Sequence, residues 1–177
     1  MLREPPIAHT NSVARYTCGQ GHAFNYLEEV VAYMRPAHRL RLAVNLANGS
    51  TLGGLALAAA GRSRLTAAPG GLTVAHQVRL PMRSDTFCVG NVILTRLDPD
   101  GLAPDGRLFA HESRHATQYA CCGGLVMLPL YGLAAALSWA LTGNTGSLNV
   151  FERRAGLADG GYPGPRLRPA VRRALRR

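Results

Sequence analysis

The chain has 177 residues and a formal net charge of +10, and 47% of its residues are hydrophobic. This length suits one domain with a hydrophobic core, and the apolar content excludes a largely disordered chain. All 20 basic residues are arginine, and no zinc-finger spacing or aromatic-interleaved basic stripe occurs, so nucleic acid is not expected as a partner. Four cysteines make no disulfide framework, which is typical of a reducing compartment.

Residues 1–35 are expected to form an irregular segment with one helix. Residues 25–35 (NYLEEVVAYMR) carry apolar side chains at helical spacing, and Pro36 is expected to end that helix. Cys18 and His22 resemble half of a metal site, but no second half follows, so no metal is assigned to them. Because no cleavable signal peptide is visible, we expect the protein to be cytoplasmic, or associated with a membrane and facing the cytoplasm.

Residues 42–61 (LAVNLANGSTLGGLALAAAG) contain no charged side chain. A transmembrane helix needs about 20 predominantly apolar residues. Asn45, Asn48 and several glycines interrupt this run, which makes it a weak candidate for a span. The sequence leaves open whether the run crosses, dips into or avoids a membrane.

Two β-rich stretches follow, at residues 71–80 and 87–97, and the segment PMRSDT between them can form a turn. We expect these stretches to form an antiparallel pair. After a loop, Asp105 is a candidate N-cap for a helix over residues 107–122, which the glycines at 123 and 124 would end.

The expected helix contains the sequence His111-Glu112-Ser113-Arg114-His115. Residues four apart lie on one helix face, so the two imidazoles can bind a single Zn²⁺. Glu112 lies about 100° round the helix, where its carboxylate can take a proton from water without being a ligand. The spacing therefore predicts a metallohydrolase site rather than a pair of structural histidines.

No Asp, Glu or Arg occurs in residues 116–151. Within this stretch, residues 125–141 (LVMLPLYGLAAALSWAL) are nearly all apolar, although Pro129 and Gly132 interrupt them. We expect a buried or membrane-dipping helix, with a true span as the alternative. The tail, residues 166–177, holds six arginines and no acid, and is expected to be solvated or to contact anionic lipid.

A catalytic zinc site needs a third protein ligand. Downstream of His115 the chain has only two acids, Glu152 and Asp159. Glu152 lies in a short helix expected near residues 148–157, and a helix packed on the first one would place this carboxylate over the histidines. The alternative is a surface ion pair between Glu152 and a neighbouring arginine, and we favour the metal ligand.

The HESRH sequence, with Asn149-x-Phe151-Glu152 downstream, resembles the gluzincin type of zincin metallopeptidase. This resemblance implies that zinc is held by three side chains while a glutamate acts as the catalytic base, in roles that fall on His111, His115, Glu152 and Glu112. The blocks HESRHATQYA and FERRAGLADGGY also make residues 42–162 similar to small uncharacterised actinobacterial proteins, which brings no established substrate.

The resemblance also suggests supporting residues. Gln118 could orient a ligand or face solvent. Many gluzincins carry an acid four residues after the third ligand, but that position is Gly156 here, so Asp159 is a weaker candidate for support. Residues 90–96 are the best candidate for an edge strand that binds substrate, with a core strand as the alternative. Three tyrosines are equal candidates to stabilise an oxyanion: Tyr119, Tyr131 and Tyr162.

We therefore expect an α+β fold. Residues 36–165 would form a minimal zincin-like domain, with a small antiparallel β element beside the HExxH helix and a packed apolar helix, and residues 166–177 a basic tail. The expected function is zinc-dependent hydrolysis of an unknown peptide or protein substrate, with Glu112 activating water. The alternatives are a non-catalytic zinc-binding membrane or interaction protein, and a basic surface protein with a chance motif.

Overall fold

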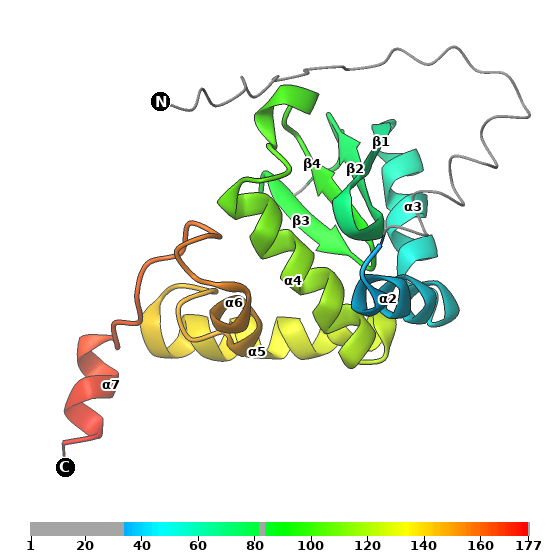
Figure 1. The fold of residues 1–177 in the computed structure, drawn as a ribbon. Coiled ribbons are helices and arrows are strands. Elements are labelled where there is room, and N and C mark those ends of the chain that lie inside the picture. Colours follow the sequence, from blue (N-terminus) through cyan, green and yellow to red (C-terminus); the bar gives the residue numbers. More distant parts are fainter. Residues whose placement is uncertain (1–33, 82–83, 177) are drawn as a thin grey trace, which may run out of the picture. The chain divides into compact units, whose positions relative to one another are not determined.

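The computed structural model describes residues 34–81 and 84–176, and Figure 1 shows their arrangement. Apart from its last two residues, the helix expected over residues 25–35 lies outside this part, as do Cys18 and His22. The described residues form a small mixed sheet with several helices, which confirms an α+β fold at this coarse level.

The sheet has four strands in the order β1-β2-β4-β3. Their bounds are β1 Arg64–Ala68, β2 Leu72–His76, β3 Thr86–Val89 and β4 Val92–Thr95. The stretch expected as one strand over residues 87–97 is a hairpin, because Gly90 has a φ of 59° and the chain turns there. Gly-Asn is a favoured two-residue hairpin turn, so this signal was present in the sequence.

The expected antiparallel pairing of residues 71–80 with residues 87–97 is wrong. Strand β2 pairs in parallel with β4, with Val74 opposite Ile93, and its antiparallel partner is β1. The hairpin at Gly90 explains the difference, since β3 occupies the antiparallel position beside β4.

Strand β4 is the centre of the core, and its four residues are all buried. Val92 and Leu94 pack with Ala58 on one side, whereas Ile93 packs with Phe109 and Ala116 on the other, as alternating side chains of a strand do. Within residues 90–96, β4 is therefore an inner core strand, and the expectation of an edge strand there is wrong. The edge strand that contacts the HExxH helix is β3.

The uncharged run at residues 42–61 belongs to two helices, α2 (Pro36–Ala47) and α3 (Ser50–Ala60). The helices are bent by 73° where Gly49 adopts a φ of 77°. Asn45, which interrupts the apolar pattern, is buried and donates to Asn91 Oδ1 at 2.6 Å and to the Ala116 carbonyl at 2.8 Å. This polar side chain therefore ties α2 to the hairpin and to the HExxH helix.

Four more helices follow: α4 (Arg107–Cys121), α5 (Met127–Thr142), α6 (Val150–Ala155) and α7 (Pro169–Ala174). Short 3₁₀ turns cover Pro69–Gly71, Pro99–Gly101 and Gly124–Val126. The expected helix over residues 107–122 is confirmed as α4, but Gly106 rather than Asp105 occupies its N-cap and makes no side-chain bond there.

The helix expected over residues 125–141 exists, but most of it is not buried. The stretch Gly124–Thr142 is long and apolar enough to cross a membrane, and only 17% of it is buried in the described part of the chain. Its C-terminal end contacts the basic tail, because the guanidinium of Arg168 lies 4.8 Å from the centre of the Trp139 ring. The helix packs on the domain through one face, where Met127 and Ser138 are buried, and the reading of a fully buried helix is wrong.

Candidate metal centre

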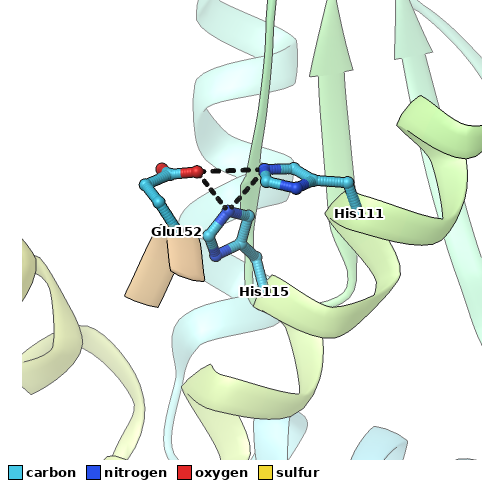
Figure 2. Close-up of side chains that lie close together, drawn as sticks. All are labelled: His111, His115 and Glu152. Atoms are coloured by element: carbon cyan, nitrogen blue, oxygen red, sulfur yellow. Dashed lines mark hydrogen bonds and ion pairs between the residues drawn. The ribbon is translucent and has the colours of Figure 1, made fainter. Parts of the chain in front are cut away.

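Two histidines of α4 and a glutamate of α6 point toward one another (Figure 2). The Nε2 atoms of His111 and His115 lie 3.0 Å apart. Oε2 of Glu152 lies 3.1 Å from the first of these nitrogens and 3.6 Å from the second. All three side chains are buried, so the structure brings together the three residues that the sequence predicts as metal ligands.

Helix α4 places both histidines on the face that it turns toward the protein interior. The buried residues of this helix recur at three- and four-residue spacing: Phe109, His111, Glu112, His115, Ala116 and Tyr119. Because Phe109 and Ala116 pack in the core with β4, the imidazoles next to them have a fixed position relative to the sheet.

Helix α6 supplies Glu152 from its first turn. The side chain of Asn149 accepts a hydrogen bond from the Phe151 N–H at 3.0 Å, and so caps the start of the helix. The short helix expected here is confirmed. Glu152 is 2% exposed and faces the two histidines, so the alternative of a surface ion pair with a neighbouring arginine is wrong.

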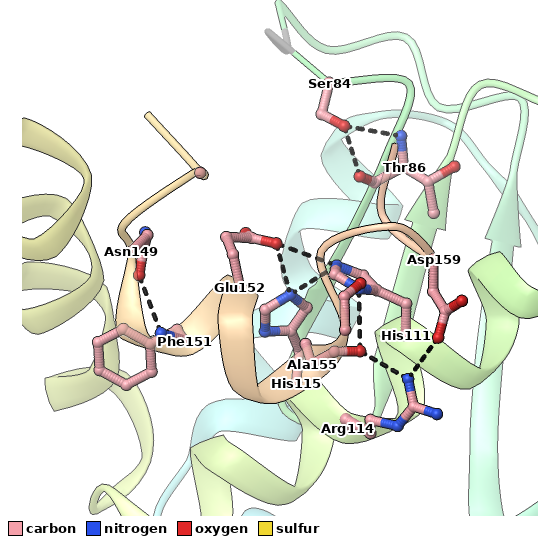
Figure 3. Close-up of polar contacts among 12 residues, drawn as sticks. Ser84, Thr86, His111, Arg114, His115, Asn149, Phe151, Glu152, Ala155 and Asp159 are labelled. Carbon is pink, nitrogen blue, oxygen red and sulfur yellow. Dashed lines mark hydrogen bonds and ion pairs between the residues drawn. The ribbon is translucent and has the colours of Figure 1, made fainter. Parts of the chain in front are cut away.

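The other ring nitrogen of His111 is held by backbone. Its Nδ1 lies 3.1 Å from the carbonyl oxygens of both Ala155 and Gly156 (Figure 3 shows Ala155). A carbonyl oxygen can only accept, so Nδ1 carries the proton. The Nε2 of a neutral His111 therefore presents a lone pair to His115 and Glu152.

The same holds for His115 through Gln118. The Gln118 Nε2 donates to the Phe151 carbonyl at 2.9 Å, which fixes the orientation of the amide. Its Oε1 then faces the Nδ1 of His115 at 2.9 Å and accepts from it. Gln118 thus orients a histidine, as the supporting role predicted for it requires, and the Nε2 of a neutral His115 presents its lone pair to His111 and Glu152.

Three acceptor atoms therefore meet in a buried place, which is unfavourable unless a cation or an added proton lies among them. The pKa values of His111 and Glu152 also show that this site favours positive charge. Burial alone lowers the pKa of His111, but the bond with Glu152 and the charges of Glu112 and Glu152 raise it on balance. Burial raises the pKa of Glu152, yet the neighbouring His111 and His115 and the hydrogen bond from Tyr131 lower it to about 2.

The separations of the three atoms fit a zinc ion. Zinc bonds of about 2.0–2.1 Å in a tetrahedron place ligand atoms about 3.3 Å apart. The observed separations of 3.0, 3.1 and 3.6 Å lie on either side of that value. A circle through the three atoms has a radius of about 1.9 Å, so a point about 2 Å from all of them exists just outside their plane. Two imidazoles and one carboxylate are also the donors of catalytic zinc sites.

No protein-family model, curated protein or solved structure matches this chain. The resemblance to gluzincins accordingly remains a prediction from the motif. What the centre can do follows from its own geometry and from the side chains around it.

Glu112 is buried beside the three candidate ligands. Its Oε2 has no hydrogen-bond partner among the described residues. Burial raises the pKa of Glu112 to about 7, against the opposite effect of the nearby His115 and His111. A carboxyl group with a pKa near neutrality can both accept and release a proton, which suits a general base.

The structure distinguishes the three tyrosines that the sequence left equal. Tyr131 of α5 donates its hydroxyl to Oε1 of Glu152 at 2.5 Å. Tyr119 lies in the hydrophobic core with Val92. The pKa of Tyr162 is raised by burial and by the charge of Glu152, so Tyr162 is near the centre. Tyr131 thus holds a candidate ligand, and Tyr162 lies beside the same carboxylate.

Asp159 belongs to a network one layer further out. It forms an ion pair with Arg107 at 2.8 Å, and one with Arg114 at 3.0 Å that Figure 3 shows. Arg114 also donates to the Ala155 carbonyl at 2.6 Å, the same oxygen that accepts from His111. Asp159 therefore does not contact a histidine. Gly156, with a φ of 95°, ends α6.

Gly160 is a residue that the sequence reading missed. A Cβ atom at this position would lie 2.5 Å from Cε1 and 2.7 Å from Nε2 of His111, so the backbone of residue 160 rests directly on the imidazole. This residue belongs to the Gly-Gly pair in FERRAGLADGGY. Nothing local in the sequence indicates that one of the two glycines lies against a ligand.

Proposed function

We propose that this protein is a zinc-dependent hydrolase of peptide bonds. The observation that carries the proposal is the meeting of His111 Nε2, His115 Nε2 and Glu152 Oε2, three buried atoms within 3.6 Å of one another. Three protein ligands leave a fourth position for water or substrate, which distinguishes catalytic zinc sites from closed structural ones.

Zinc held by these side chains would supply a Lewis acid that polarises a carbonyl group and lowers the pKa of water. Glu112 then accepts a proton from the attacking water at its unpaired Oε2 as the water oxygen bonds to the carbonyl carbon. The same carboxyl group donates this proton to the amine nitrogen when the C–N bond breaks. Gln118 and the Ala155 carbonyl keep the imidazoles in the tautomer that binds a cation, and Tyr131 holds the other oxygen of Glu152.

The test compares metal content and hydrolysis in three proteins. Purified wild type should contain about one zinc per chain and cleave a library of quenched fluorescent peptides. Glu112→Gln should keep the zinc and lose hydrolysis by about 10²- to 10⁴-fold, because the amide cannot accept the proton. His115→Ala should lose both, since it removes a ligand.

The outcomes separate this proposal from its alternatives. A wild type that binds zinc stoichiometrically but cleaves no peptide, with Glu112→Gln unchanged in every respect, would identify a non-catalytic zinc site. A wild type that takes up no zinc would overturn the metal centre altogether and leave the HESRH sequence as a chance motif.

A further inference from the structure

Helix α5 exposes an apolar face. The exposed side chains of this face include large leucines and a tryptophan, and two more apolar side chains are exposed on the 3₁₀ turn before it: Leu128, Leu130, Leu133, Leu137 and Trp139 on α5, and Leu125 and Val126 on the turn. Helices on the surface of a soluble domain usually turn charged or polar side chains outward. Gly124–Thr142 contains no charged residue at all, so this helix turns apolar side chains outward where a surface helix usually has charged ones.

The opposite face of α5 packs against the rest of the domain. Met127 is buried in the core with Tyr119, and Ser138 is fully buried and donates to the Asn144 carbonyl. Tyr131 bonds to Glu152 from the same side. The helix therefore lies along the domain, below α4 in Figure 1, and its outer face is exposed.

The apolar surface continues from α5 onto α3. A Cβ atom at Gly53 would lie 3.4 Å from the side chain of Leu125, so α3 contacts the 3₁₀ turn Gly124–Val126 that leads into α5. Leu52, beside this contact, is 60% exposed. A contiguous apolar surface of this kind on a soluble monomer marks an interaction site.

A basic segment is attached at the C-terminal end of the apolar face. Arg168 stacks on the Trp139 ring at 4.8 Å, and its backbone N–H donates to the Leu141 carbonyl at 2.9 Å. The exposed residues that follow include three more arginines: Arg172, Arg173 and Arg176. No Asp or Glu occurs after Asp159, so the positive charge of this segment has no local acid to balance it.

We propose that the outer face of α5 docks on the surface of a bilayer that contains anionic lipid. Leucines would enter the acyl boundary, Trp139 would lie at the headgroup level, and the arginines that follow Arg168 would contact lipid phosphates. A second copy of the chain is a poorer occupant, because it would bring another unbalanced arginine segment of the same sign to the same surface. The proposal does not depend on the metal centre.

The experiment is flotation of the full-length protein with lipid vesicles. The wild type should float with vesicles of phosphatidylcholine containing about 30 mol% phosphatidylglycerol, and on the order of 100-fold less with phosphatidylcholine alone, because each arginine near an anionic surface contributes about fivefold. Raised salt should weaken the binding to the anionic vesicles, since it screens the arginines.

Two variants and two matched controls locate the binding surface. Leu133→Glu should reduce flotation at least tenfold, whereas Leu65→Glu, on the exposed strand β1, should float like wild type. Exchange of three tail arginines for Gln should remove the preference for anionic vesicles, and exchange of three exposed arginines elsewhere should keep it. The tail set is Arg172, Arg173 and Arg176, and the control set is Arg62, Arg64 and Arg79.

Three outcomes would overturn the proposal. The first is a wild type that floats with neither vesicle. The second is a Leu133→Glu variant that floats as well as wild type. The third is a dimer in light scattering that Leu133→Glu dissociates without any flotation of the wild type, which would make the face an interface between copies. Zinc content measured on the same samples should not change, so a failure here leaves the proposed hydrolase untouched.

Discussion

Replacement of Gly160 by alanine should weaken metal binding without removing any ligand. The added methyl would lie 2.5 Å from Cε1 of His111, whereas carbon atoms in good contact are about 3.5–4.0 Å apart. The ring or the loop must therefore move by about 1 Å. His111 cannot simply retreat, because its Nδ1 is bonded to the carbonyls of Ala155 and Gly156.

A shift of this size is large for a metal ligand, whose bond length is defined within about 0.2 Å. We expect the zinc affinity of Gly160→Ala to fall by about 10- to 100-fold, the range found when the groups that orient a ligand are lost. Competition with a chromophoric zinc chelator measures this change directly. Circular dichroism of the zinc-free variant checks that the fold persists.

Gly164→Ala is the matched control in the same loop. A Cβ atom there meets no described atom within 4 Å, and the residue does not adopt a positive φ. Its zinc affinity should stay within about twofold of wild type, because no contact that orients a ligand is lost. If Gly160→Ala also binds zinc like wild type while it keeps the native fold, the packing of residue 160 on His111 does not position the ligand.

Three further predictions concern the same centre. Zinc at 100 times its dissociation constant should stabilise the protein by about 2.7 kcal/mol and raise its Tm by roughly 5–10 °C in a thermal scan, and a chelator that leaves Tm unchanged would contradict this. Gln118→Leu should weaken zinc binding by about 10-fold or more in the chelator assay, because the N–H of His115 loses its acceptor, whereas Gln118→Glu should retain most of the affinity. Tyr131→Phe should lower zinc affinity in that assay while the stoichiometry stays at one, because Glu152 keeps Oε2 but loses the donor at Oε1; an unchanged affinity would show that Tyr131 serves only packing.

The histidine pair of the site could be predicted from the sequence, because it depends only on the spacing of residues within one helix. His111 and His115 share a face because the spacing of four follows from the helical repeat, and α4 begins and ends close to the expected residues. Glu152 was identified for a different reason, since the chain offers only one other acid downstream. That argument worked because the composition left few alternatives, and it contained no information on how α6 packs on α4.

The parts that depend on long-range pairing could not be predicted. The parallel contact between β2 and β4 joins segments whose order in the sheet is set by packing, and no residue pattern distinguishes it from an antiparallel pair. The Gly-Asn pair at residues 90 and 91 is a local signal for a hairpin, but it lies within an apolar run that resembles a single strand. Asn45 looked like a defect in a membrane span, and its partners Asn91 and Ala116 lie more than 40 residues away.

The outer contacts of the centre are mostly backbone groups, and this also limits prediction. The carbonyls of Ala155 and Gly156 orient His111, but any residue type carries a carbonyl. Asp159 was a reasonable candidate by residue type alone. It contacts Arg107 and Arg114 instead.

The separation of the candidate ligands along the chain has a consequence for folding. His111 lies on α4 and Glu152 on α6, and the whole of α5 lies between these two helices in the sequence. The two side chains therefore meet only when the intervening chain has folded back and brought α6 onto α4. A metal bound between them would act as a cross-link. In the chain-entropy description of cross-links, closing a loop of about 40 residues is worth about 4 kcal/mol through the unfolded state. Zinc would thus restrict the unfolded chain around an apolar helix that has little buried surface of its own to hold it in place.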